Sequence, residues 1–588
     1  MKQLGILDSA FINLEQTNTP QHVGGLGIYD PSTAPGGFVR FKDVISSFQR
    51  RLNKQPMFRT RLIEVPGGLD RPYWVKDANF DVEFHLRHIA LPEPGDWRQL
   101  CIQVARLHAR PLDMGRPLWE AYIIEGLDNI PGLPSGCFAI YTKMHHSLVD
   151  GAGGSSFMAL IHDLVANPGP EAEDDEEPML VDVEPSMSEL LSKASFNSVK
   201  NTFQVMRGTV KTAVDLGRYA LDVARNEIPA PDLSAPKTVL NQPVGPHRVF
   251  DAAEFPLEGF KAIKNAAGVT VNDVALTVIG GAMRKYLEAR GELPAEGSLA
   301  AAIPLNMRTR RGITDDNNQV GSVFCSLNTD IADPMERLLA VNQSSKDAKT
   351  SGEASPLVDA LKIAGAVSPV VAKTAAGIWA RNELSSYIPA NTSTVVSNVA
   401  GPDFPLYCAG ARMVDYFGLG LLTPGMGLFH LVFSYSGKIT LSVLADRNIL
   451  PDPEMYHQYL VDAYESLFEA ATAGKSKDGK AEDSKRKRSA TKPPAKKKAA
   501  ARKKAPAKEK APVNKKAPVK KKAPAKKKAP AKKKAPAVKK APAKKKAASS
   551  KAPAKKKAAA KKAPAKKATA RKKSPAKARP KARPKLAS

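Results

Sequence analysis

In Lys143-Met144-His145-His146-Ser147-Leu148-Val149-Asp150-Gly151, two adjacent histidines stand between a predicted strand and a predicted helix. The residues from Cys137 to Met144 are β-branched, aromatic and small, which is typical of a strand. Downstream, Ser155 or Ser156 can cap a helix whose apolar residues follow at i, i+3, i+4 and i+7, namely Phe157, Leu160, Ile161 and Leu164. Successive side chains in extended backbone point to opposite faces. We therefore expect one histidine to face a cleft and the other to pack inward.

This arrangement suits general base catalysis. The histidine side chain titrates close to working pH. Its neutral imidazole can therefore take a proton from an alcohol or thiol and pass it to a leaving group. Asp150 can hold the turn and fix the ring orientation if it pairs with an arginine, and Gly151 allows a sharp turn. The alternative is a pair of structural histidines, with Asp150 as an ordinary acid at a helix start. A zinc site is not expected, because adjacent histidines diverge and no further ligand spacing follows.

Further motifs accompany this stretch. They are Leu7-Asp8-Ser9-Ala10-Phe11 with Thr19-Pro20-Gln21-His22-Val23-Gly24, then Pro117-Leu118-Trp119, Asn272-Asp273, Ser397-Asn398-Val399-Ala400-Gly401-Pro402 and Ala445-Asp446-Arg447. Together with His-His-x-x-x-Asp-Gly, they make residues 1–474 resemble the bacterial wax ester synthase/diacylglycerol acyltransferase family. Asn306 departs from the family pattern, and the role of Arg308 stays open.

The resemblance implies an α/β (α+β) fold with two halves like those of chloramphenicol acetyltransferase and condensation domains, and a channel between them. It implies an acyl-CoA-dependent O-acyltransferase that esterifies diacylglycerol, a long-chain fatty alcohol or both. No covalent acyl-enzyme, metal or permanently bound cofactor is needed, and acyl-CoA is the co-substrate. His146 is then the general base, His145 supports the turn, Asp150 is structural and orienting, and Gly151 completes the motif.

Two of these motifs have both a structural and a functional interpretation. Pro117, Leu118 and Trp119 are either the buried start of a strand or an apolar wall near the acyl channel. Thr270 stands three residues before Asp273, a capping-box pattern, so Asp273 can simply cap a helix over Val274 to Arg290. The resemblance favours a second role for this position, in which the Asn272 amide and the N–H groups of the helix start stabilise an oxyanion.

Composition divides the 588 residues into four segments, since a chain this long exceeds one compact domain. Residues 1–167 and 248–474 are the two α/β halves. The connector, residues 168–247, starts as an acidic, proline-containing loop and continues over Ser188 to Arg225 as one long or two shorter amphipathic helices. These either pack across the halves or contact an anionic membrane or lipid-droplet surface. Residues 475–588 form the fourth segment.

Local patterns predict further elements. Strands are expected at Val23–Tyr29, Tyr73–Val75, Val82–Leu86, Leu118–Glu125, Leu299–Ile303 and Thr394–Val399, helices at Phe41–Leu52, Trp97–His108 and around Tyr459, and a hairpin over Gly427–Ala445 that turns at Ser436-Gly437. The four cysteines are widely spaced and are expected to be buried thiols in a reducing compartment. No run of 18 apolar residues and no convincing signal peptide is present, so no spanning helix is expected.

The fourth segment, residues 475–588, is a basic tail. It contains 48 Lys and Arg against four Asp and Glu, a net charge of +44, so the remaining residues carry −13 of the total of +31. The hexad Ala-Pro-Ala-Lys-Lys-Lys recurs, and no aromatic residue follows Gly474. We expect a disordered segment, similar to linker-histone tails, that binds nucleic acid or other polyanions non-specifically. The alternative is a solubilising appendage without a partner.

Two other functions stay open at this point. One is an acyltransferase or condensation enzyme of the same fold with another acceptor, such as an amine or a polyketide alcohol. The other is a non-enzymatic nucleoid- or lipid-droplet-binding protein. The resemblance places the protein in the bacterial cytoplasm, peripherally associated with the inner membrane or lipid inclusions. It does not choose between triacylglycerol and wax ester, nor does it give the acyl chain length or the oligomeric state.

Overall fold

The computed structural model of the protein describes residues 1–148, 158, 161–168, 184–230, 235–306, 320–354, 368–381 and 392–489. Contacts divide the chain into two compact units, Met1–Pro494 and Ala495–Ser588, and all of the described residues lie in the first. Asp150, Gly151, Arg308 and the expected helix start at residues 155–157 lie outside the described residues, as does the chain beyond residue 489.

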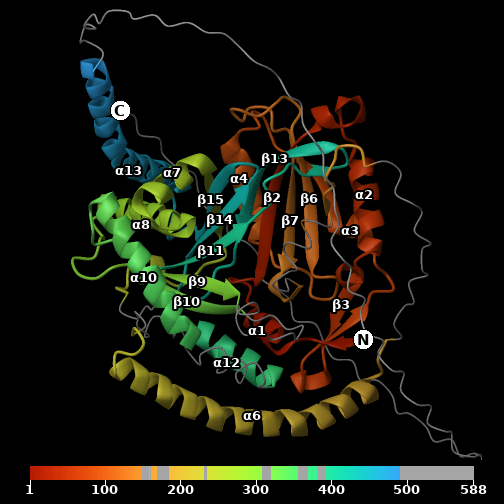
Figure 1. Cartoon of the computed structure of the whole chain (residues 1–588). Coiled ribbons are helices and arrows are strands. Elements are labelled where there is room, and N and C mark those ends of the chain that lie inside the picture. Colours follow the sequence, from red (N-terminus) through yellow and green to blue (C-terminus); the bar gives the residue numbers. More distant parts are fainter. Residues whose placement is uncertain are drawn as a thin grey trace, which may run out of the picture. The chain divides into compact units, whose positions relative to one another are not determined.

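The first six-stranded sheet has the order β12-β13-β2-β7-β6-β5 (Figure 1). Its strands are β2 (His22–Asp30), β5 (Leu86–Ala90), β6 (Trp119–Glu125), β7 (Phe138–His145), β12 (Tyr407–Cys408) and β13 (Ala411–Leu419). Every residue of β7 is buried, because β7 lies inside the sheet and both of its faces are covered. Helix α2 (Phe41–Asn53) packs on one face through Phe48, and α4 (Trp97–His108) packs on the other through Leu100.

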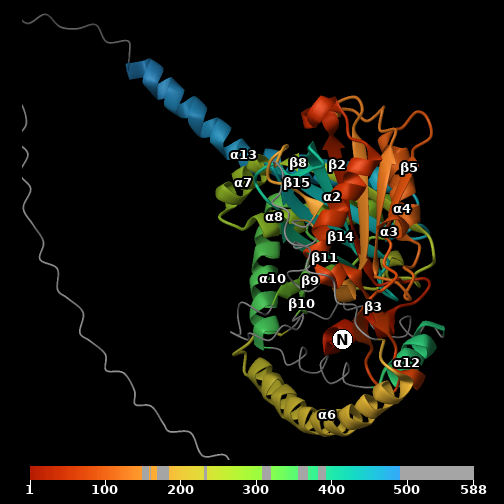
Figure 2. The ribbon, with the colours of Figure 1, turned by 90° about the vertical axis from the view of Figure 1, so that its right-hand side faces the viewer.

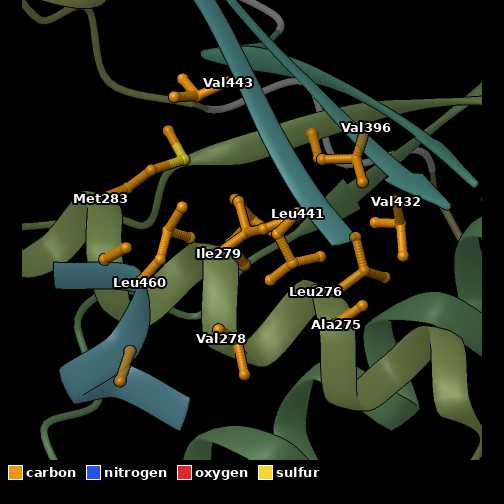
Figure 3. Close-up of a cluster of buried hydrophobic side chains, with 14 of the residues drawn as sticks. Ala275, Leu276, Val278, Ile279, Met283, Val396, Val432, Leu441, Val443 and Leu460 are labelled. Atoms are coloured by element: carbon orange, nitrogen blue, oxygen red, sulfur yellow. The ribbon is translucent and has the colours of Figure 1, made fainter. Parts of the chain in front are cut away.

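The second six-stranded sheet has the order β10-β9-β11-β14-β15-β8. Its strands are β8 (Arg248–Pro256), β9 (Ala300–Asn306), β10 (Val320–Ser326), β11 (Thr394–Ala400), β14 (Leu428–Tyr435) and β15 (Lys438–Asp446). Helices α7 (Leu257–Ala267), α8 (Val271–Ala289), α10 (Pro334–Ala354) and α13 (Pro453–Ser489) accompany it. Figure 3 shows its apolar core, where Leu276, Ile279 and Met283 of α8 meet Leu441 and Val443 of β15.

The two halves share a sheet. β13 belongs to the later half of the sequence but pairs antiparallel with β2, with Met413 opposite Tyr29 and Leu419 opposite Gly24. The same strand contacts β15, where the Thr440 hydroxyl donates to the Tyr416 carbonyl at 3.0 Å. A segment from the second half therefore completes the sheet that carries the histidine motif.

A third, smaller sheet has the order β1-β4-β3, with β1 (Lys2–Gln3), β3 (Thr60–Ile63) and β4 (Tyr73–Lys76). The connector forms one helix of 38 residues, α6 (Met187–Ala224), which begins where the Ser186 hydroxyl accepts the Glu189 N–H at 3.2 Å. The remaining elements are α1 (Ile6–Leu14), α3 (Val82–His85), α12 (Pro369–Arg381) and the 3-10 turns η1 (Pro31–Thr33), η2 (Pro35–Gly37), η3 (Pro56–Arg59), η4 (Pro66–Gly68), η5 (His146–Leu148) and η6 (Val239–Asn241).

Most of the predicted elements are confirmed, including the Thr270–Asp273 capping box and the β14–β15 hairpin. Of the two alternatives for the connector, one long helix or two shorter ones, the structure has the single long helix. The strand predicted over Val82–Leu86 is wrong. The Asp81 carboxylate caps the Glu83 N–H at 2.9 Å and starts one helical turn, so the strand begins only at Leu86. Leu164 lies in a bend and is 69% exposed, so the predicted apolar helix stripe does not reach it.

All four cysteines are buried free thiols, as predicted. Of the helices in the described residues, none alone combines the length and the apolarity needed to cross a bilayer; α7 and α8 satisfy both criteria only when taken together, across a bend of 101°.

Candidate active site

The histidine motif is held from both sides by backbone hydrogen bonds. β7 ends at His145, whose N–H donates to the Leu118 carbonyl at 2.9 Å, and η5 begins at His146, whose N–H donates to the Gln21 carbonyl at 2.8 Å. These partners precede β6 and β2, the two neighbours of β7 in the sheet. The two imidazoles therefore leave a backbone that is fixed on either side.

His145 is fully buried, and its tautomer follows from its partners. Its Nδ1 accepts the Ser147 N–H at 3.1 Å and contacts the Ser147 hydroxyl at 2.8 Å. Because Nδ1 accepts this hydrogen bond, Nε2 carries a proton. That nitrogen lies 3.4 Å from Glu15 Oε2, an electrostatic contact that falls short of hydrogen-bond geometry. The same Glu15 oxygen accepts the Gln21 N–H at 2.5 Å.

His146 is only half-buried, and its ring stacks on Phe11 of α1 at 3.9 Å between centroids. Its Nδ1 is sealed from solvent and has no hydrogen-bond partner among the described residues, so Nε2 is the nitrogen left to meet a substrate. Burial, with a smaller contribution from His145, lowers the pKa of His146 to about 4, while the residue's own backbone opposes this. The imidazole is therefore neutral at pH 7. The predicted division into one inward and one accessible histidine matches this difference in burial.

Buried charge anchors the strand behind the motif. Lys143 Nζ donates to the carbonyls of Leu107 at 3.2 Å and Arg110 at 2.9 Å, at the C-terminal end of α4, and lies 3.3 Å from the Glu120 carboxylate. Burial lowers the pKa of Lys143, and the Glu120 carboxylate opposes that shift. A cation at a helix C-terminus also matches the helix dipole. These contacts fix β7 two residues before His145.

Four other histidines of the first half also have protein partners. His22 Nε2 donates to the His108 carbonyl at 2.6 Å, and His108 Nε2 donates to the Gly420 carbonyl at 2.7 Å. His85 Nδ1 donates to the Trp119 carbonyl at 2.7 Å, and His88 pairs with Glu125 at 3.0 Å. Burial lowers the pKa of His108 to about 3. His22 Nδ1 is buried without a partner among the described residues.

A pocket with about 400 Å³ of free space, counted with its open mouth, lies beside the motif between β2, β7 and β13. It is lined by Val23, Gly24, Gly25, Thr142, Met144, Met158, Ile161, His162 and Tyr416. Gly25 lets the Tyr416 ring approach β2 closely, because a Cβ on it would stand 2.0 Å from the Tyr416 hydroxyl. The second half thus contributes Tyr416 to a pocket whose other side is formed by the strand that carries the motif.

Pro117, Leu118 and Trp119 are buried, and other residues line the pocket just described. Trp119 stacks on His85 at 4.6 Å, and its Nε1 donates to the Phe58 carbonyl at 2.7 Å. The Leu118 carbonyl has the more direct link to the site, because it holds the His145 N–H. A place for these residues in the wall of an acyl channel stays a prediction.

Asn272 and Asp273 lie at the start of α8. Asp273 Oδ2 accepts the Thr270 N–H at 2.9 Å and the Asn342 amide at 2.7 Å, so this carboxylate caps the helix and ties it to α10. Asn272 Oδ1 accepts the Asn398 amide at 3.0 Å, which joins two of the sequence motifs. Within the described residues, no hydrogen bond or ring contact connects this group to His146, and an oxyanion role for Asn272 stays a prediction.

Three residues near the motif carried no recognisable sequence signal of their role. Glu15 follows α1 directly, Phe11 lies within α1, and Tyr416 is some 270 positions further along the chain than His146. Only the opening motif, which includes Phe11, pointed to this part of the sequence. Among the described residues, no group of three or more His, Cys, Asp or Glu is placed to hold a metal ion.

Comparison with known proteins agrees with these motifs. Residues 4–275 match the family model of the wax ester synthase/diacylglycerol acyltransferase catalytic domain, and residues 317–468 match that of the WS/DGAT C-terminal domain. A Mycobacterium tuberculosis H37Rv protein, provisionally named as a diacylglycerol O-acyltransferase, is 33% identical over 79% of this chain and 99% of its own length. The O-acyltransferase WSD of Acinetobacter baylyi is 30% identical over 80% of this chain and 98% of its own length.

A solved structure gives the same fold. The wax ester synthase/diacylglycerol acyltransferase from Marinobacter aquaeolei VT8 superposes with a TM-score of 0.54 and 26% sequence identity. The match covers 80% of this chain and 100% of that one. The predicted mixed α/β fold in two parts is therefore confirmed.

Proposed function

The chain belongs to the wax ester synthase/diacylglycerol acyltransferase family, and on that premise we propose that it is an acyl-CoA-dependent O-acyltransferase. Its acceptor is the hydroxyl of diacylglycerol, of a long-chain fatty alcohol, or of both. The observation that carries the proposal is the state of His146, whose ring is neutral and half-buried and whose Nδ1 is buried without a partner among the described residues. We therefore assign Nε2 to the substrate. A base must be unprotonated to accept the proton of an alcohol.

The proposed reaction proceeds without a covalent acyl-enzyme. His146 Nε2 takes the hydroxyl proton as the alcohol oxygen attacks the thioester carbonyl carbon. The tetrahedral intermediate then collapses, the C–S bond breaks, and the departing CoA thiolate takes the proton back from the imidazolium. The products are an ester and CoA, and the enzyme returns to its starting state. The Phe11 ring stacked on His146 limits the ring's rotation, which keeps Nε2 aimed in one direction.

Other residues position this base. His145 is locked by Ser147 and Glu15, and Gln21 links the Glu15 carboxylate to the His146 N–H. We assign Asp150 and Gly151 to the shape of the turn that follows. Asn272, with the N–H groups at the start of α8, is the candidate to stabilise the oxyanion, because a helix N-terminus carries partial positive charge.

The pocket between β2, β7 and β13 is the proposed place for an apolar chain of a substrate. Its lining is apolar apart from Thr142, His162 and the Tyr416 hydroxyl, as expected for a site that holds a lipid chain. It reaches the motif through Met144, which lies on the same strand face that leads to His146.

The test is an acceptor panel with purified full-length protein and radiolabelled palmitoyl-CoA. Diolein, hexadecanol, a long-chain amine and a polyketide alcohol are offered separately, and products are separated by thin-layer chromatography. We expect triacylglycerol, wax ester or both, and none of these with His146→Ala. His88→Gln, which removes a surface imidazole, is the matched control and keeps full turnover. Formation of the amide alone would show that the acceptor is an amine and not an alcohol. The absence of any acyl transfer would refute the proposal.

We also propose that residues 475–588 bind polyanions independently of the acyltransferase body. A net charge of +44 without aromatic residues supports counterion-driven binding and argues against sequence readout. Binding of double-stranded DNA to the full chain should then weaken steeply between about 50 and 200 mM salt and be competed by polyphosphate. Binding that depends on DNA sequence, or that does not respond to salt, would refute this role.

A further inference from the structure

The connector helix α6 has two apolar faces. Leu190, Ala194 and Thr212 are 4%, 3% and 6% exposed, and their spacing puts them on one side of the helix with Tyr219. Phe196, Val210, Val214 and Leu221 are 75%, 65%, 50% and 56% exposed, and their spacing puts them on the opposite side. A surface helix normally buries its one apolar stripe and exposes polar residues. Only the first set has a partner among the described residues. We call the first set the inner face of α6, and the second set the outer stripe, which lies on its outer face.

The inner face is firmly attached at both ends. Leu190 and Ala194 pack with Val65 and Tyr73, and the Asn197 amide donates to Asp70 at 2.7 Å. Towards the other end, the Tyr219 hydroxyl lies 2.6 Å from the Ser351 hydroxyl of α10. Figures 1 and 2 both draw α6 outside the two large sheets, running from the side of β3 to the side of α10. The helix cannot turn its outer stripe inward without breaking these contacts.

A row of basic residues borders the outer stripe. Lys193, Lys211 and Arg218 are 41%, 72% and 75% exposed in their side chains, and helical spacing puts them on one flank of that stripe together with Arg207 and Arg225, which are also exposed. Glu189 and Asp215 pair with three of these cations, which leaves the flank net positive. The chain outside the basic tail carries −13, so this flank is a positive strip on an acidic body.

A second set of exposed apolar residues lies near the start of the helix, beside η4. η4 contacts both α6 and α12, and next to it Leu69, Val370 and Val371 are 55%, 44% and 57% exposed. Isolated exposed apolar residues are ordinary, but apolar residues repeated at helical spacing along one exposed side of a helix mark an interaction surface.

We propose that the outer face of α6 docks on an anionic lipid surface. Apolar side chains bordered by cations are the two signals that hold an amphipathic helix in the interface of a membrane. The negative body would be repelled elsewhere, so the positive strip also orients the protein. A second copy of the chain is a poorer fit, since it would bring two positive flanks together. The proposal extends the lipid acyltransferase function to the surface that carries its acceptor, but its evidence lies in α6 alone.

The basic tail is a polycation and is also expected to bind anionic vesicles. A probe on α6 itself is therefore needed to separate the two modes of binding. All four native cysteines are buried, which leaves an introduced cysteine open to selective labelling in the folded protein. The probe is an environment-sensitive fluorophore at Val214→Cys in the full chain. The matched control is Ser46→Cys, an exposed position on α2. Vesicles contain equal parts of phosphatidylglycerol and phosphatidylcholine, or phosphatidylcholine alone. In a separate control without lipid, double-stranded DNA is added to bind the tail.

With the anionic vesicles, we expect a blue shift and at least a twofold rise in emission at position 214 and no change at position 46. DNA should change neither. The double variant Phe196→Ser, Val214→Ser should lower vesicle partitioning in 0.5 M salt by about tenfold, because salt screens the tail but not apolar insertion. Turnover of decanoyl-CoA with a water-soluble alcohol should be unchanged in that variant.

Vesicle binding without a shift at position 214 would show that the tail alone holds the protein, and would overturn the proposal. A shift that grows with protein concentration in the absence of lipid would identify a second copy as the occupant, and would also overturn it. Failure of the acyltransferase assay leaves these readouts intact, so the two proposals fail separately.

Discussion

The imidazoles of His146 in η5 and His430 in β14 belong to different halves of the body, and burial keeps both neutral. It lowers the pKa of His146 to about 4 and that of His430 to about 3. His430 has both nitrogens occupied, with Nδ1 2.9 Å from the Thr394 hydroxyl and Nε2 2.8 Å from the Tyr456 hydroxyl. His146 has a buried Nδ1 without a partner among the described residues, and the proposed mechanism uses its Nε2.

This difference separates two uses of a buried histidine. A lowered pKa alone marks both residues equally, so it does not identify a base. In the second half, the ring of His430 joins α13 to β11 and β14 as a saturated hydrogen-bond bridge. In the first half, the ring of His146 is held by stacking on Phe11, which uses no nitrogen. Holding a ring by its face leaves its edge free for chemistry.

The largest expected effect comes from making the same substitution in both places. His146→Leu should lower kcat by about 10²- to 10⁴-fold, the contribution of a general base, with little change in stability. His430→Leu should leave kcat of the folded protein within about threefold. It should lower the free energy of unfolding by about 2–4 kcal/mol, because the Tyr456 hydroxyl loses its imidazole partner and the Thr394 hydroxyl keeps only its backbone contacts. Steady-state kinetics and denaturant unfolding measure the two quantities.

The prediction would be wrong if the effects on activity and on stability were found in the opposite variants. A stable, fully active His146→Leu would move catalysis elsewhere. An inactive but normally stable His430→Leu would give His430 a role that its saturated contacts do not suggest.

The second effect concerns how the first site holds its base. Glu15→Gln keeps an acceptor for the Gln21 N–H but removes the charge 3.4 Å from His145 Nε2. We expect kcat to fall about 10- to 100-fold with KM unchanged, because a small misplacement of a catalytic group has this cost. Glu125→Gln is the matched control, since Glu125 lies 3.0 Å from the ring of the surface residue His88. Equal losses in both variants would mean that the charge of Glu15 has no special part in the site.

The sequence predicted those parts of this site that lie next to one another along the chain. The adjacent histidines, the strand before them and the Thr270–Asp273 cap depend on local spacing, and the structure confirms their geometry. The pairing of β13 with β2 joins residues almost 400 positions apart, and no local periodicity encodes it. Glu15, Phe11 and Tyr416 were missed for the same reason, since each acts on the motif only after long-range folding. The Val82–Leu86 error was different, because there a single capping aspartate outweighed a strand-like composition.

A third, smaller effect tests the strand that the halves share. Gly25→Ala would place a Cβ 2.0 Å from the Tyr416 hydroxyl and push that ring within the pocket. We expect preference for the acyl-CoA or alcohol chain to shift by about 3- to 10-fold, at the low end of what a change of about one methylene in an apolar pocket produces. Tyr416→Phe in the same chain removes the clashing oxygen and should restore part of the original preference. If selectivity in kcat/KM across acyl-CoAs and alcohols of graded length were unchanged, the apolar chain of the substrate would not bind in this pocket.

The smallest effect is the dependence on pH, where the two histidines should behave alike in stability but not in activity. Both pKa values lie below the value of about 6.5 expected in the unfolded chain, so between these limits the unfolded state binds more protons and stability falls as the pH falls. From pH 7.5 to 5.5, each imidazole should remove about 1.4 kcal/mol of stability, and either Leu variant should abolish its own share. Denaturant midpoints at the two pH values measure this.

Activity should respond differently over the same interval. A base with a pKa of about 4 stays unprotonated at pH 5.5, so kcat/KM should be flat where stability is already declining. A solvated histidine would instead lose about tenfold there, with a midpoint near 6.5. If the wild type lost activity with a midpoint near pH 6.5, and variants of the other histidines kept this loss, the ring of His146 would be hydrated during turnover. The distinction between a base kept neutral by burial and one kept neutral only by solution pH therefore depends on a single titration.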